Sequence, residues 1–117
     1  MRALLLTLCI LLGAGAARAQ PIPGAQPEAA RRDALVRIVR QDCGSCHGMR
    51  LTGGLGPALT RDALADKPLD SMVATIYHGR PGTPMPGWKT MISEADALWI
   101  AQQLFAGFPE EAKAAAR

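Results

Sequence analysis

Three stretches of the chain repeat apolar residues at intervals of three and four, which is the period of an amphipathic helix. They cover residues 28–42, 67–79 and 93–107, and Ser93 with Asp96 forms a variant of the capping box that opens helices. The apolar positions are Leu35, Val36, Ile38 and Val39, then Leu69, Met72, Val73, Ile76 and Tyr77, and finally Ala97, Leu98, Ile100, Ala101, Leu104 and Phe105. The pattern therefore predicts three main helices.

Polar residues refine the first helix and add a short one. Pro27 and Glu28 suit the first turn of a helix, where proline loses no hydrogen bond and a carboxylate meets the positive helix end. Thr60 is expected to cap a short helical turn over residues 61–65. The first stretch also carries four arginines on its expected solvent side: Arg31, Arg32, Arg37 and Arg40. They could steer an acidic partner, but an ordinary solvated helix face is the simpler interpretation.

Residues 1–19 have the pattern of a secretory signal. A nearly uninterrupted apolar run over residues 3–17 follows an arginine, and Ala17-Arg18-Ala19 provides a small-x-small cleavage site before Gln20. The run is shorter than the roughly 20 residues that a spanning helix needs. We therefore favour cleavage over an uncleaved anchor, and predict no stable membrane insertion afterwards. Cys9 would be removed with the signal.

The segments at the two ends of the mature chain delimit a single domain. Residues 20–27 are rich in proline and read as a flexible leader, and residues 108–117 read as a frayed tail, which leaves a domain at residues 28–107. Removing residues 1–19 takes away two arginines, so the net charge falls from +3 to +1. So small a charge gives no reason to expect nucleic acid as a partner.

The densest chemistry lies in Cys43-Gly44-Ser45-Cys46-His47. Two cysteines three residues apart with a histidine directly behind them have the spacing that attaches a c-type haem. Cys43 and Cys46 would form the thioethers, and His47 would bind the iron. A redox dithiol, half of a zinc site and a simple disulfide are the alternatives. The chain shows no βαβ setting for a dithiol, and only His78 could add a further zinc ligand after cleavage.

Two loops accompany this motif. Residues 48–56 are rich in glycine but do not match a phosphate loop, so we expect the backbone there to pass close to a flat cofactor. Residues 78–89 are rich in proline and form a stiff, non-helical connection. Met85 lies in that connection, where a thioether has little use unless its sulfur acts as a ligand. We therefore predict Met85 as the second iron ligand, opposite His47.

Other ligands remain open at this stage. His78 could replace Met85 and give a bis-histidine haem, although a loop histidine is the simpler interpretation. Met91 could substitute if the loop rearranged. Met72 is expected in the core, and Met49 is too close to His47 in the sequence to reach the far side of the porphyrin.

With both ends of the iron axis assigned, residues 30–107 resemble a class I cytochrome c. The resemblance rests on Cys43-x-x-Cys46-His47-Gly48, Gly56-Pro57-x-Leu59 and Met85-Pro86, in that order between helices. It implies an all-α fold, with three main helices and short turns around one covalent haem c, and with the first and last helices crossing. The carbonyl of Pro57 would accept a hydrogen bond from His47, and Leu59 would pack on the haem. Trp88 and Arg80 are expected near the propionates.

The residues around the motifs resemble one subfamily of cytochromes more closely. Residues 41–49, 53–59 and 78–86 are similar to NirC-type small cytochromes, which belong to the denitrification gene clusters of the haem-cd nitrite reductase. Members are thought to deliver electrons to that reductase or to help mature its haem d. The resemblance implies a periplasmic electron carrier, not an enzyme, with nitrite reductase or haem d maturation proteins as redox partners.

Two functions other than electron transfer, and a domain-swapped dimer, remain as alternatives. A peroxidase or gas sensor would need an open sixth position on the iron, and a chaperone-like protein would bind haem d precursors. No residue of the sequence demands either function. Because Met85 lies on a long connection between packed helices, loosening that connection would also permit a domain-swapped dimer.

Overall fold

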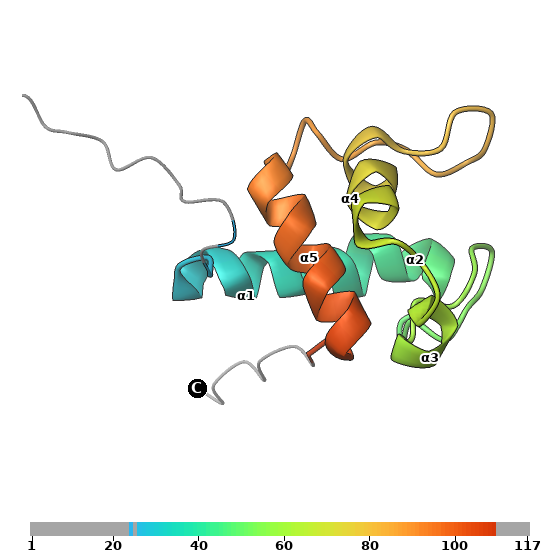
Figure 1. Ribbon diagram of the computed structural model, residues 1–117, viewed down its shortest axis with the longest axis horizontal. Coiled ribbons are helices and arrows are strands. Elements are labelled where there is room, and N and C mark those ends of the chain that lie inside the picture. Colours follow the sequence, from blue (N-terminus) through green and yellow to red (C-terminus); the bar gives the residue numbers. More distant parts are fainter. Residues whose placement is uncertain (1–23, 25, 110–117) are drawn as a thin grey trace, which may run out of the picture.

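The computed structural model describes Gly24 and residues 26–109, and in that part of the chain every regular element is helical. Figure 1 shows a long amino-terminal helical run, with a second long helix lying across it and shorter elements beside them. The elements are α1 (Ala29–Ile38), η1 (Val39–Cys43), α2 (Gly44–His47), α3 (Arg61–Leu64), α4 (Leu69–His78) and α5 (Glu94–Ala106). The predicted all-α class is confirmed, with α1, α4 and α5 as the main helices.

The first three elements form one rod, because the backbone keeps right-handed helical angles at both junctions. The rod begins at Ala29, and Glu28 is its N-cap instead of part of the first turn. Its middle segment, η1, is a π-helical turn, which holds more residues than an α-turn and therefore rotates later side chains about the axis. Arg40 was predicted on the solvated face, but it is only 7% exposed. The prediction was wrong because Arg40 lies one helical turn after the buried Val36, and the carbonyls of Phe108 and Pro109 accept hydrogen bonds from its guanidinium there.

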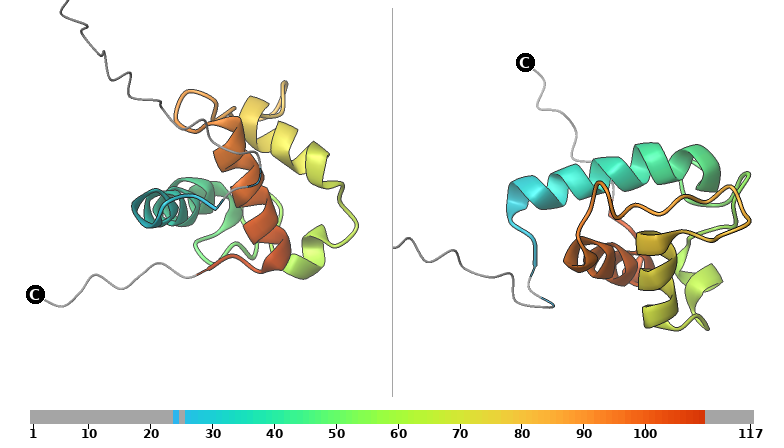
Figure 2. Two further views of the ribbon diagram at one scale, coloured as in Figure 1. Left: turned by 60° about the vertical axis from the view of Figure 1, so that its left-hand side comes forward. Right: turned by 90° about the horizontal axis from the view of Figure 1, so that it is seen from above.

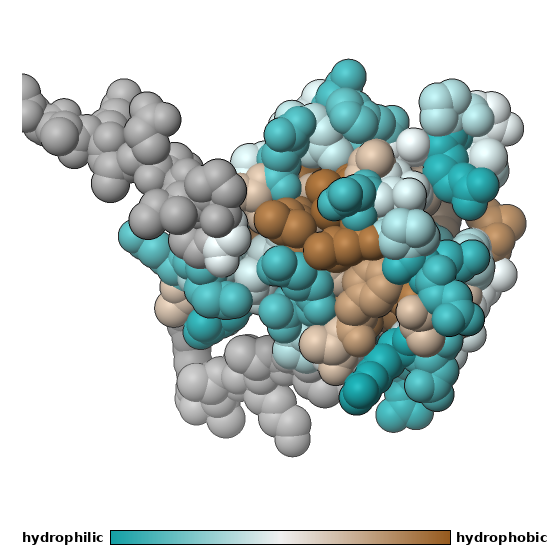
Figure 3. Space-filling view, viewed as in Figure 1, coloured by the Kyte–Doolittle hydropathy of each residue, from teal (hydrophilic) through white to brown (hydrophobic). Residues whose placement is uncertain are grey.

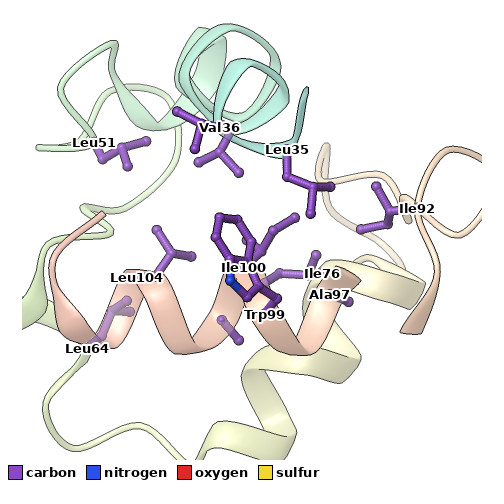
Figure 4. Close-up of a cluster of buried hydrophobic side chains, with 12 residues drawn as sticks. Leu35, Val36, Leu51, Leu64, Ile76, Ile92, Ala97, Trp99, Ile100 and Leu104 are labelled. Carbon is purple, nitrogen blue, oxygen red and sulfur yellow. The ribbon is translucent and has the colours of Figure 1, made fainter. Parts of the chain in front are cut away.

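The core lies where α5 crosses α1, as the views in Figures 1 and 2 agree. Figure 4 shows Leu35 and Val36 of α1 facing Ile100 of α5. The buried apolar residues are Leu35, Val36, Val39, Leu51, Leu64, Ile76, Ile92, Ala97, Trp99, Ile100, Ala101 and Leu104. The predicted crossing of the first and last helices is therefore confirmed.

Helix ends follow the signals in the sequence. The Ser93 hydroxyl accepts a hydrogen bond of 3.1 Å from the Asp96 amide, and the Asp96 carboxylate accepts one of 2.9 Å from the Ser93 amide. This reciprocal pair is the predicted capping box at the start of α5. Thr60 caps α3, as expected. Gly79 ends α4 at a φ of 75°, where residues with a Cβ are disfavoured.

The packed part of the chain extends beyond the predicted limits of residues 28 and 107. Gln26, predicted in a flexible leader, accepts a 2.8 Å hydrogen bond from the indole of Trp99. Phe108, predicted in a frayed tail, packs edge-on against Trp99 with ring centroids 6.3 Å apart. The predicted signal at residues 1–19 and the tail beyond Pro109 lie outside the described residues. Among the residues described, none forms a helix both long and apolar enough to cross a membrane.

Candidate haem site

One cavity of about 880 Å³ brings together all six residues predicted for the site. Its volume falls within the range of roughly 300–1,000 Å³ that is common for cofactor sites. The predicted residues that line it are Cys43, Cys46, His47, Pro57, Leu59 and Met85. They come from η1, α2 and the two loops, so the cavity forms only when these distant segments meet.

The two cysteines reach the cavity from the end of the amino-terminal rod. Cys43 ends η1 and Cys46 lies in α2, and both side chains are free and half-buried. Burial raises the pKa of the Cys43 thiol to about 11, and the carboxylate of Asp42 acts in the same direction. No cluster of three or more His, Cys, Asp or Glu residues suited to a metal occurs in the described part of the chain.

His47 is held in one orientation by its surroundings. Its Nδ1 lies 2.7 Å from the carbonyl oxygen of Pro57, and the residue is 8% exposed. A ring whose Nδ1–H donates to a carbonyl presents Nε2 as its lone-pair donor, which is how ligating histidines are commonly fixed. A Cβ added to Gly56 would lie 2.7 Å from Cε1 of the same ring. Glycine at this position is therefore needed for the approach of the loop to the imidazole.

The glycine-rich loop folds back onto the haem-attachment motif. The amides of Gly53 and Gly56 donate hydrogen bonds of 2.8 Å to the carbonyls of His47 and Cys46. A Cβ on Gly54 would lie 2.8 Å from the Cys46 carbonyl oxygen. These glycines were expected to allow a close approach to the cofactor itself. In the structure their tight contacts are with the motif that attaches the cofactor.

Met85 reaches the same cavity from the connection between α4 and α5. Its side chain is half-buried, and Met72 of α4 also lines this cavity. Met49 and Met91 are 62% and 55% exposed and do not line it. The other predicted neighbours, Arg80 and Trp88, do line it.

His78 belongs to a different surface feature. It lies in a groove of about 530 Å³ between α4 and α5, together with Tyr77, Leu98 and the carboxylates of Asp70 and Glu94. Figure 3 shows apolar side chains reaching the surface between these two helices, with polar groups around them. His78 also contacts Tyr77 edge-on, with ring centroids 4.9 Å apart. This placement gives no support to His78 as the second iron ligand.

The residues around the cavity fit a c-type haem. Two thiols, one oriented imidazole and one thioether converge on a space whose walls include Val39, Leu59, Ile76, Ile100 and Leu104. These are the groups that thioether attachment and axial ligation require. Trp99 packs in the core and does not line this cavity.

Several cavity residues were not predicted to line the site. Val39, Met72, Ile76, Ile100 and Leu104 were recognised only as apolar positions of helices, although the cavity and the core share these helices. The period of a helix shows which residues avoid water. It does not separate those that pack on protein from those that pack on a cofactor.

Similarity to known proteins agrees with this site. Residues 30–103 match the family model described as "Cytochrome C oxidase, cbb3-type, subunit III". Cytochrome c55X of Stutzerimonas stutzeri is 56% identical over 86 residues, covering 74% of this chain and 76% of that protein. The solved structure of c-type cytochrome NirC has a TM-score of 0.67 and 55% identity, covering 68% of this chain and 94% of that one.

A longer protein contains a region of the same kind. The solved structure of dihydro-heme d1 dehydrogenase NirN in complex with DHE has a TM-score of 0.56 and 33% identity. The match covers 65% of this chain but only 16% of that one, so most of that enzyme has no counterpart here. The motif, the helical fold and these relatives together show that the chain belongs to the c-type cytochromes, electron-transfer proteins with a covalent haem, in the family of cytochrome c55X and NirC.

Proposed function

We propose that this monohaem cytochrome is a periplasmic carrier of single electrons in denitrification. Its partners would be the haem-cd nitrite reductase or the proteins that mature haem d. The similarity to NirC and to one region of dihydro-heme d1 dehydrogenase supports this assignment. The observation that carries the electron-transfer mechanism is the convergence of the oriented His47 and Met85 on one cavity.

In this proposal His47 would hold the haem iron through its imidazole Nε2, and Met85 would hold it through its sulfur. When bound, the haem supplies an iron that changes its charge by one electron. A thioether ligand raises the reduction potential relative to two imidazoles. The apolar cavity wall acts in the same direction, because a medium of low dielectric disfavours the more highly charged form. With both positions filled, no site for a substrate remains on the iron.

The ligand assignment is tested by the visible spectrum of the oxidised protein. Methionine bound to ferric iron gives a weak charge-transfer band in the far red, which we expect in the wild type and not in Met85→Ala. Met91→Ala is the matched control and should keep the band, since Met91 is exposed and does not line the cavity. An oxidised wild type without this band would contradict ligation by Met85 and favour a ligand-binding haem.

Partner choice requires a kinetic experiment. If the chain donates electrons to nitrite reductase, the ferrous protein should be oxidised rapidly by that enzyme with nitrite in a stopped-flow mixer. If it serves haem d maturation, the ferric protein should be reduced by dihydro-heme d1 dehydrogenase turning over its substrate. A cytochrome that reacts with neither would exclude the proposed partners, while its status as an electron carrier would stand.

A chaperone-like role is the alternative function. It draws support from the resemblance to a region of an enzyme whose structure is a complex with DHE. Titration of the holoprotein with a haem d precursor separates the two roles, because a pure carrier should show no saturable change in the precursor spectrum. Saturable binding would favour the chaperone.

Export and assembly complete the proposal. We expect the protein in the periplasmic fraction to begin at Gln20, which amino-terminal sequencing would test. Exchange of α5 between two chains would require the connection after α4 to open. Size-exclusion chromatography of the oxidised and reduced forms would show whether such a dimer accumulates.

A further inference from the structure

The connection between α4 and α5 crosses its own beginning where Gly79 and Gly87 meet. A Cβ built on Gly79 would lie 2.5 Å from the Gly87 amide nitrogen and 2.8 Å from the Met85 carbonyl oxygen. A Cβ built on Gly87 would lie 2.7 Å from the carbonyl oxygen of His78 and 2.9 Å from that of Tyr77. Real Cβ atoms do not approach backbone atoms so closely, so both positions accept only glycine without movement of the backbone.

Hydrogen bonds register the returning part of this connection against α4. The amides of Trp88 and Lys89 donate to the carbonyls of Ile76 and Tyr77, at 3.1 and 3.2 Å. These carbonyls lie in the last turn of α4, where no further helical amide is available to them. The returning segment therefore acts as a cap for α4. Its position is tied to a helix that itself lines the haem cavity.

Two more links hold the segment that carries Met85. The Arg80 amide donates a hydrogen bond of 3.2 Å to the Met85 carbonyl oxygen. The Thr83 hydroxyl donates a hydrogen bond of 2.7 Å to the Arg80 carbonyl oxygen, and it accepts one of 3.4 Å from the Met85 amide. Residues 79–87 thus form a closed loop with the glycine contact at its base. We refer to the Gly79–Gly87 contact as the glycine clasp.

We propose that Gly79 and Gly87 are positioning residues, which set the distance between the Met85 sulfur and the haem iron by letting the returning segment lie directly on the end of α4. The proposal rests on ligation by Met85 and goes beyond it, because neither glycine lines the cavity. A side chain in the clasp must push the returning segment away from α4, and Met85 moves with it. Displacements on the order of 1 Å are enough to disrupt a positioned ligand.

The loop contains its own control. Gly82 has a φ of 78°, but a Cβ there would meet nothing within 4 Å. Gly87 has no positive φ, so replacing it tests close approach alone, whereas replacing Gly82 tests backbone strain alone. If the glycine clasp positions Met85, only replacement of Gly87 should disturb the coordination of the iron.

The experiment compares Gly87→Ala, Gly82→Ala and Met85→Ala as holoproteins. We expect Gly87→Ala to lose the far-red band and to have a lower reduction potential, approaching Met85→Ala, while its helical circular dichroism is kept. Added imidazole should bind it about tenfold more tightly than the wild type, because apparent affinity rises with the fraction of molecules whose sixth position is open. Gly82→Ala should match the wild type in all three properties.

Each outcome bears on the clasp. A wild type with the far-red band and a Gly87→Ala variant with unchanged band, potential and imidazole affinity would overturn the clasp alone. A wild type without the band would overturn Met85 ligation, and the clasp with it. If Gly87→Ala does not accumulate as holoprotein, Gly79→Ala replaces it, with Gly82→Ala as its control, since both glycines have a positive φ but only Gly79 has a close contact. An unchanged band, potential and imidazole affinity in Gly79→Ala would reject the proposal.

Discussion

At the residue scale, Arg40 is a charged side chain on the buried face of the amino-terminal rod. Its guanidinium donates hydrogen bonds of 2.8 to 3.1 Å to the carbonyls of Phe108 and Pro109. It also lies over the Phe108 ring, 5.6 Å from the centroid, which is a favourable distance for a cation and an aromatic face. One buried residue of the rod thus anchors the chain beyond α5.

Replacing Arg40 by alanine should destabilise the holoprotein by about 1–3 kcal/mol, because partly buried carbonyls lose their donors. Urea denaturation followed by circular dichroism would measure the change. Arg37→Ala is the matched control, since Arg37 is an exposed arginine of the neighbouring turn and surface changes usually stay within about 0.5 kcal/mol. Equal effects of the two substitutions would show that the buried contacts of Arg40 add nothing.

At the element scale, an ion pair fastens the start of α5 to α1. Arg31 Nη2 lies 2.7 Å from Asp96 Oδ2, and it also donates a hydrogen bond of 3.4 Å to the Met91 carbonyl oxygen. Burial alone would raise the pKa of Asp96, but hydrogen bonds from Arg31 and Ser93 outweigh it and lower the pKa below its ordinary value. The capping box and the ion pair share one carboxylate, so capping of α5 and its attachment to α1 depend on the same charge.

The depressed pKa of Asp96 predicts a pH-dependent contribution to stability. A carboxyl whose pKa is lower in the folded state stabilises the fold above its unfolded pKa, and this contribution is lost as the pH falls through the folded value. Asp96→Asn should therefore cost about 1 kcal/mol near neutral pH, a modest figure because Arg31 is partly solvated. The difference from wild type should shrink below pH 3.8.

Chemical denaturation at several pH values would test this, with Asp66→Asn as an exposed control. A wild-type advantage over Asp96→Asn that persists undiminished into strong acid would exclude the ionised carboxylate as its source.

At the scale of the whole molecule, the haem is expected to complete the core. The cavity of about 880 Å³ is bordered by Val39, Ile76, Ile100 and Leu104, all of which also belong to the buried cluster between the helices. Protein interiors tolerate few voids, because atoms facing an empty space lose their contacts. A haem held in this cavity would pack against these side chains and shield them from water.

We therefore expect Cys43→Ser combined with Cys46→Ser to give an unfolded or degraded product. Without thioethers the haem is not retained, and the apolar cavity wall is exposed to water. Thermal circular dichroism of the purified double variant would measure this, with Ser45→Ala as a control that keeps both cysteines. A cooperative melt of the haem-free double variant would disprove the dependence of the fold on haem.

Much of the fold could be predicted because its signals are local. Ser93 and Asp96 interact within one helical turn, and Gly79 ends α4 through its own backbone freedom. The attachment motif was equally clear, since Cys43, Cys46 and His47 lie within five residues. Nothing local shows that Arg31 reaches Asp96, or that Gln26 meets Trp99, because these contacts join segments more than 60 residues apart.

The sequence by itself determined the chemistry of this protein: the type of cofactor, the residues that attach it and the helices that surround it. These depend on residue type and short spacing, which the chain carries wherever it folds. Only the tertiary structure decided which apolar residues line the cavity, that Arg40 is buried, and that Gly79 and Gly87 meet beneath Met85. Such features arise from contacts between segments that are distant in the sequence, so no local pattern specifies them.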